Sequence, residues 1–161
     1  MIFDRRSTYL SMIENSVGTK MFQSCFFKKV NTDWSVSSDV CDEGRLSCAF
    51  HVSGILKMMD LVRVMCVTVG GLERELNNTG WRECIVYPLE IGDVIFWEAM
   101  KNSDGKEHRH CGFYVKINDM GTEIYVSNLD KGINGNVPHE HTKDYWCERR
   151  IEKVYRHPFF I

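Results

Sequence analysis

The chain has 161 residues, so we expect residues 1–161 to form a single domain. Hydrophobic residues make up 43% and charged residues 26%, which is typical of a folded globular domain and argues against disorder. The formal net charge is −2 and the Lys and Arg residues are scattered, which argues against nucleic acid as a partner. No apolar run has the length of a membrane span, so no membrane partner is expected either.

The first residues and the cysteines bear on the compartment. Residues 1–6 lack the apolar run of a secretory signal. The seven cysteines are an odd number, and no two have the CxxC spacing of structural zinc sites. These features predict a reducing compartment, so we expect a cytoplasmic location, or export without an N-terminal Sec signal. No metal or cofactor is predicted, and the sequence holds no signal for an oligomeric state.

Helices are predicted in the first half of the chain. Apolar residues recur at helical spacing from Tyr9 to Phe22. A polar segment over residues 31–44 is expected to form an irregular loop. A second helix is predicted over about residues 47–64, and apolar positions nearly surround it, which indicates a buried central helix. A shorter amphipathic helix is expected over residues 71–78.

The second half of the chain is predicted to form strands, over residues 93–97, 111–117, 123–127 and 151–155. A turn at residues 118–121 joins the second and third of these into a hairpin, and residues 131–143 are expected to form a loop. Helices followed by antiparallel strands predict an α+β domain, with N-terminal helices packed on a curved antiparallel sheet.

Cys48 is the main candidate for chemistry because it opens the predicted buried helix. The unpaired N–H groups and the positive dipole end of a helix favour the thiolate, which is the reactive form of cysteine. The same N–H groups can bind an oxyanion during acyl transfer. The alternative interpretation is a buried structural cysteine.

His110 is the candidate base, because a cysteine nucleophile needs an imidazole nearby. It lies where a polar segment enters the strand at residues 111–117, which would hold its ring rigidly beside a cleft. The alternative is a solvated loop histidine.

A third polar residue should orient the imidazole from the neighbouring strand, and only one of two successive side chains can face His110. We prefer Asn128 for its amide oxygen, with Ser127 as the alternative.

Four segments, in this order, resemble the CHAP and NlpC-type cysteine amidases and peptidases, a branch of the papain-like fold. They are SCAF at residues 47–50, GDVIFW at 92–97, HCGFYV at 110–115 and YVSN at 125–128. The resemblance covers about residues 44–130. It implies a papain-like fold with Cys48 as nucleophile, His110 as base and Asn128 or Ser127 as the third residue. The activity that it implies is amide hydrolysis through an acyl-enzyme, with a peptide or peptidoglycan substrate.

The sequence departs from the pattern of these enzymes at two positions beside the candidate residues. Ser47 precedes the nucleophile where many of these enzymes have Asp, and Cys111 follows the histidine where an aliphatic residue is usual. Asp93, which follows Gly92, is expected to form a turn or cap and not to act as an acid.

Two other classes of function remain open on the sequence. One is a binding module that keeps this fold without turnover. The other is a metal-binding protein that holds zinc or copper through its histidine-rich segments, whose candidate ligands are His108, His110, Cys111, His139 and His141.

Overall fold

The computed structural model describes residues 1–31, 34–101, 105–128, 136–142 and 149–160 of the chain. Its helices are α1 (Arg5–Asn15), α2 (Cys48–Met58) and α3 (Val69–Asn78), with a short 3-10 helix η2 (Pro158–Phe160). Its strands are β1 (Phe26–Asn31), β2 (Trp34–Asp39), β3 (Arg82–Cys84), β4 (Val94–Lys101), β5 (Glu107–Ile117), β6 (Glu123–Asn128), β7 (Pro138–Thr142) and β8 (Ile151–Arg156).

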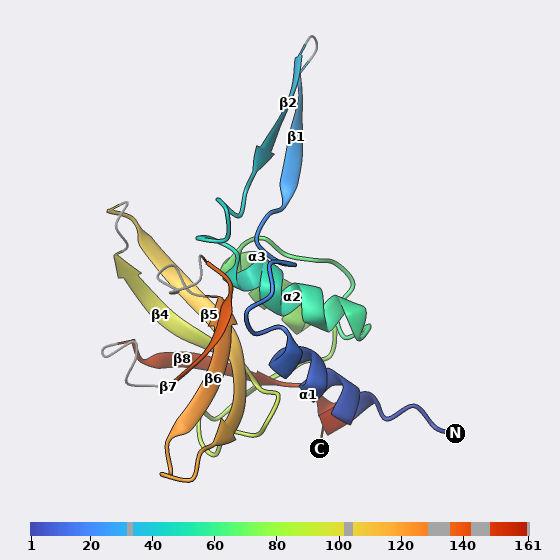
Figure 1. Ribbon diagram of the computed structural model, residues 1–161, viewed down its shortest axis with the longest axis vertical. Helices are drawn as coiled ribbons and strands as arrows, with labels where there is room; N and C mark the ends of the chain where they lie inside the picture. Colours follow the sequence, from blue (N-terminus) through green and yellow to red (C-terminus); the bar gives the residue numbers. More distant parts are fainter. Residues whose placement is uncertain (32–33, 102–104, 129–135, 143–148, 161) are drawn as a thin grey trace.

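Six of the strands form one antiparallel sheet in the order β3-β8-β4-β5-β6-β7. Register shifts interrupt the pairing of β4 with β5 between Trp97 and Met100, and that of β5 with β6 between Tyr114 and Lys116. Such irregularities bend strands and increase their twist. The three helices lie over one face of this sheet, with α2 against β5 and β6 (Figure 1). The prediction of an α+β domain with an antiparallel sheet is confirmed.

Alternate side chains of β5 face the two sides of the sheet, as strand geometry requires. Cys111, Phe113 and Val115 join the core under the helices. Tyr114 packs with Trp97 and Tyr125 in a smaller cluster on the other face. The ring of His110 packs beside this cluster, 5.4 Å from that of Trp97 between centroids. The start of β5 therefore directs Cys111 into the core under the helices and holds the His110 ring against Trp97.

Helix α2 is buried on nearly all sides, as its apolar sequence predicts. Val52, Ile55 and Leu56 are fully buried, and each such side chain contributes about 1.5–3 kcal/mol through the removal of apolar surface from water. His51 is also buried, and its Nε2 lies 2.8 Å from the Ser16 hydroxyl. That contact satisfies one polar atom of a ring that otherwise packs against aromatic side chains.

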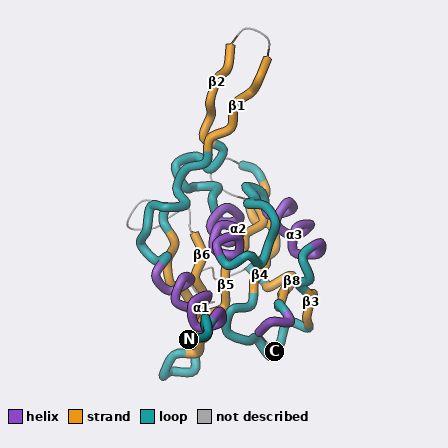
Figure 2. Tube along the Cα trace, turned by 90° about the vertical axis from the view of Figure 1, so that its right-hand side faces the viewer, coloured by secondary structure: helices purple, strands orange, loops and turns teal. Residues whose placement is uncertain are grey.

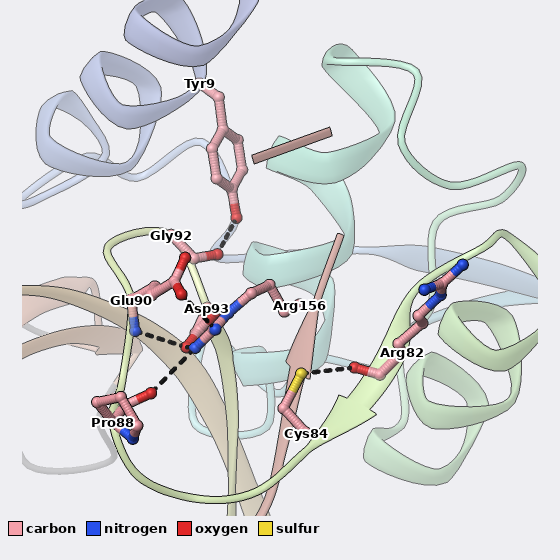
Figure 3. Close-up of polar contacts among 8 residues, drawn as sticks. All are labelled: Tyr9, Arg82, Cys84, Pro88, Glu90, Gly92, Asp93 and Arg156. Carbon is pink, nitrogen blue, oxygen red and sulfur yellow. Dashed lines mark hydrogen bonds and ion pairs between the residues drawn. The ribbon is translucent and has the colours of Figure 1, made fainter. Parts of the chain in front are cut away.

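The turn at Gly92 and Asp93 joins the N-terminal helix to the sheet (Figure 3). The Tyr9 hydroxyl of α1 donates to the Gly92 carbonyl at 2.8 Å. The Asp93 carboxylate accepts the N–H of Glu90 at 2.8 Å and two hydrogen bonds from the Arg156 guanidinium, at 2.8 and 2.7 Å. Asp93 thus closes a turn and pairs with the half-buried guanidinium of Arg156, which confirms the structural role expected for it.

A hairpin of β1 and β2 projects from the body, apart from the main sheet (Figures 1 and 2). This corrects the expectation of an irregular loop over residues 31–44. The helix predicted from Tyr9 to Phe22 ends at Asn15, and Gly18 follows with a φ of +75°. The hairpin makes the first part of the chain mixed in structure and not purely helical.

Other boundaries also differ from those predicted. Helix α2 ends at Met58, before the expected residue 64, and β5 begins at Glu107, so that His110 lies inside a strand and not at its entry. Besides β1 and β2, two further strands were not predicted: β3, and β7 within the segment expected to be a loop. The predicted hairpin of residues 111–117 and 123–127 is confirmed as β5 and β6. None of the described helices combines the length and apolar character that a bilayer crossing requires.

Candidate active site

Cys48 is the first residue of α2 and is half-buried. The segment before it is tied to the end of β6, because the Asn128 amide donates to the Ser47 hydroxyl and, at 3.3 Å, to the Gly44 carbonyl. Ser47 in turn donates to the Gly44 carbonyl at 3.1 Å. Gly44 has a φ of +94°, in the left-handed region that favours glycine. These contacts fix the start of α2 against the sheet.

The surroundings of Cys48 stabilise its thiolate. A hydrogen bond with the Cys111 thiol is the largest influence that lowers the pKa of Cys48, and the charge of His110 and a hydrogen bond with its ring lower it further. The N–H of Cys111 also bonds the sulfur, and together these contacts outweigh burial, which acts in the opposite direction. The pKa of Cys48 therefore lies well below that of an ordinary thiol, as a nucleophile requires.

The pKa of Cys111 is shifted in the opposite direction to that of Cys48. Burial, and then the hydrogen bond and charge of Cys48, raise the pKa of Cys111 well above its usual value. Cys111 thus keeps its proton and serves as a donor to the neighbouring sulfur. The sequence singled out Cys111 only as a departure from the family pattern and as a candidate metal ligand, so this contact was missed.

Arg149 adds a buried positive charge near the site. Its side chain is buried, and burial lowers the pKa of the guanidinium while the charge of Cys48 acts against that effect. No sequence motif pointed to Arg149, because it precedes β8 and comes close to the nucleophile only in the folded sheet.

Ser127 is the residue that contacts the imidazole of His110. Its hydroxyl oxygen lies 2.9 Å from His110 Nε2, and both side chains are buried. The preferred candidate, Asn128, instead directs its amide nitrogen to Ser47 and Gly44, and its amide oxygen has no hydrogen-bond partner among the described residues. Successive residues of β6 face opposite sides of the sheet, so only one of the two could meet His110.

Gly112 permits this arrangement of β5 and β6. A Cβ atom at this position would lie 2.6 Å from the Cβ of Ser127 and 2.7 Å from the Val126 carbonyl oxygen. Both distances are far shorter than van der Waals contact. The absence of a side chain therefore lets β6 approach closely enough for Ser127 to reach the ring two residues earlier on β5.

His141 of β7 lies on the other side of the Ser127 hydroxyl, with its Nε2 2.8 Å from the same oxygen. Its ring stacks on Tyr125 and tilts toward Trp97, and its Nδ1 lies 3.3 Å from the Thr142 carbonyl oxygen. The sequence offered His141 only as a metal ligand. Within the described ranges, no three His, Cys, Asp or Glu side chains are placed to hold a metal ion.

Comparisons of this chain with protein-family models, curated proteins and solved structures found no match. The geometry described above is therefore the basis for the function proposed below.

Proposed function

We propose that this chain is a cysteine hydrolase of the papain-like type that cleaves amide bonds through an acyl-enzyme. The observation that carries the proposal is the set of contacts at Cys48, where a helix start, a buried imidazole and a neighbouring thiol all favour the thiolate. Structural cysteines in apolar cores have raised pKa values, so the lowered pKa at Cys48 favours a reactive role.

The geometry supports acyl transfer in two steps. The Cys48 thiolate forms a bond to the amide carbonyl carbon, and the carbonyl electrons move to oxygen. The resulting oxyanion accepts hydrogen bonds from N–H groups in the first turn of α2, which lack partners within the helix. The carbon–nitrogen bond then breaks as the protonated His110 gives its proton to the leaving amine.

Hydrolysis of the thioester completes the cycle. Neutral His110 takes a proton from water, and the water oxygen attacks the thioester carbonyl. The carbon–sulfur bond breaks, the acid leaves, and the thiolate and protonated imidazole are restored. The buried guanidinium of Arg149 stabilises negative charge on the sulfur in the resting state.

By the resemblance to the CHAP and NlpC-type enzymes, we propose a stem peptide or cross-bridge of peptidoglycan as the substrate. The test is incubation of the protein with muropeptides and detection of shortened products by mass spectrometry. We expect cleavage by the unchanged protein and a loss of at least about a thousandfold in Cys48→Ala. If neither muropeptides nor other peptides are cleaved while Cys48 is reactive, the chain is a binding module.

Reactivity of the thiol is tested separately with an iodoacetamide probe and residue-level mass spectrometry. Cys25 is a matched reference, because it is also half-buried but burial raises its pKa. We expect Cys48 to be labelled at least about ten times faster than Cys25 at pH 6.5, and this advantage to disappear in His110→Ala. Equal labelling of the two cysteines in the unchanged protein would refute the enzyme proposal.

A further inference from the structure

The hydroxyl of Ser127 lies between two imidazole rings. Its oxygen is 2.9 Å from His110 Nε2 and 2.8 Å from His141 Nε2, and all three side chains are buried. A hydroxyl carries one proton, so it donates to one ring and accepts from the other. If His110 donates to the hydroxyl through Nε2, the other nitrogen of a neutral His110 presents a lone pair to Cys48. If the hydroxyl donates to His110 instead, that other nitrogen presents an N–H.

The direction follows from His141. Its Nδ1 lies 3.3 Å from the backbone carbonyl of Thr142, and a carbonyl oxygen only accepts, so Nδ1 carries a proton. Burial lowers the pKa of His141 to about 3, so the ring is neutral and has no second proton. Its Nε2 is therefore an acceptor, and the Ser127 hydroxyl donates to it.

The Ser127 oxygen is then left to accept from His110. With its own proton directed at His141, this oxygen can only receive the N–H at Nε2 of His110. The other nitrogen of that ring, Nδ1, remains for Cys48. If the Ser127 hydroxyl donated to His110 instead, a neutral His110 would carry its proton on Nδ1. That nitrogen could then not take a proton from the thiol or from water.

We propose that His141 is a positioning residue, which acts through Ser127 to hold His110 in the tautomer that serves as a base. This inference rests on the proposed function, since a tautomer matters only if His110 exchanges protons with Cys48 or water. No proton passes along the chain of hydrogen bonds; Ser127 and His141 keep theirs throughout. The arrangement gives a role to β7, which lies outside the segment that resembles the amidases.

The packing of His141 allows a clean variant. Its ring lies against Tyr125 and Trp97, so His141→Phe keeps an aromatic ring in this place and removes the Nε2 acceptor together with the N–H at Nδ1. His141→Gln supplies a carbonyl oxygen as a substitute acceptor. Tyr125→Phe is the control, because it keeps the ring that stacks on His141 and removes a hydroxyl that donates to Glu123.

The experiment measures the rate of iodoacetamide labelling at Cys48 from pH 5 to 9, with residue-level mass spectrometry. The groups that face the reacting pair and can contribute to its profile are Cys41, His51, Cys111, His141 and Arg149, and His139 faces His141. All variants retain these groups except the one replaced. Thermal unfolding of each variant identifies losses that come from packing.

We expect the labelling rate at pH 6.5 to fall about tenfold in Ser127→Ala and in His141→Phe, with the apparent pKa of Cys48 shifted upward. The double variant should be no slower than either single variant, because both break one chain of contacts. His141→Gln should recover most of the loss, and Tyr125→Phe should show the unchanged profile.

Three outcomes would overturn the inference: an unchanged profile in His141→Phe, additive losses in the double variant, or equal losses in His141→Gln and His141→Phe. These outcomes differ from a failure of the proposed function. Labelling of Cys48 is measured without a substrate, so a protein that cleaves no peptide can still show the dependence on His141. Conversely, peptide cleavage that depends on Cys48 but not on His141 rejects this inference alone.

Discussion

At the scale of single residues, Cys111 changes the chemistry of its neighbour. Its thiol donates to Cys48 and its own pKa is raised by burial and by that contact. Cys111→Val, which introduces the aliphatic residue usual at this place in the CHAP and NlpC-type enzymes, removes the donor. We expect the apparent pKa of Cys48 to rise and its labelling at pH 6 to slow about tenfold, since a hydrogen bond to a charged group is worth about 1.5–3 kcal/mol. Cys111→Ser keeps a donor and should retain most of the rate.

Residues of this site differ in how far the sequence predicts them. Cys48 and His110 carry local signals, a helix start and a strand, and the structure brings the two together. The choice between Ser127 and Asn128 depended on strand phase, and a shift of one residue turns a side chain to the other face. Asn128 therefore holds the segment before Cys48, and Ser127 meets the imidazole.

At the scale of elements, the close approach of β5 and β6 depends on Gly112. Gly112→Ala places a Cβ 2.6 Å from that of Ser127, so β6 must move away. We expect a loss of about 1–3 kcal/mol in the free energy of unfolding and slower labelling of Cys48, because Ser127 is pushed away from His110. Chemical denaturation and the labelling assay measure the two effects.

The matched control for this substitution is Gly70→Ala in α3. Within the part of the chain that the structure describes, a Cβ there would meet only Arg74 Nη1, at 3.9 Å. Because alanine is a better helix former than glycine, this variant should keep or gain stability and label normally. Similar behaviour of the two variants would show that the approach of β6 has no special importance.

Elements also differ in how well their sequences predict them. Helix α2 and the strands β5 and β6 were predicted because their apolar patterns are strong. Strand β7 has the sequence PHEHT, which has little strand character, and it is extended because it pairs with β6 along the edge of the sheet. The β1–β2 hairpin had the aromatic and β-branched residues of strands, but helical spacing before it and polar residues after it obscured the signal.

At the scale of the whole molecule, two buried histidines make stability depend on pH. Burial lowers the pKa of both His51 and His141 to about 3, whereas an unfolded histidine titrates near about 6.5. Between these values the unfolded chain binds protons that the folded chain does not. The contribution of these histidines to the free energy of unfolding is therefore complete above about pH 6.5. As the pH is lowered, it falls by about 1.4 kcal/mol per pH unit for each histidine.

His51→Gln tests the contribution of one of these two histidines and leaves the other, His141, in place. The Ser16 hydroxyl donates to the Ile13 carbonyl at 2.7 Å, so it accepts from His51, and glutamine supplies an N–H in place of the ring. Urea unfolding between pH 7 and 4.5 gives the free energy of unfolding at each pH. The slope of this free energy against pH should be smaller in the variant, by the equivalent of about one proton. An identical slope in both proteins would mean that His51 is not the residue that titrates.

The strand order has a consequence for synthesis. β8 comes after every other strand of the main sheet in the chain, yet it lies between β3 and β4. While a ribosome is still extending the chain, β4 has an unpaired edge, and the short strand β3 has no neighbour at all. The sheet can be completed only after residue 156 has emerged from the exit tunnel, so a nascent chain holding both Cys48 and His110 is still incomplete.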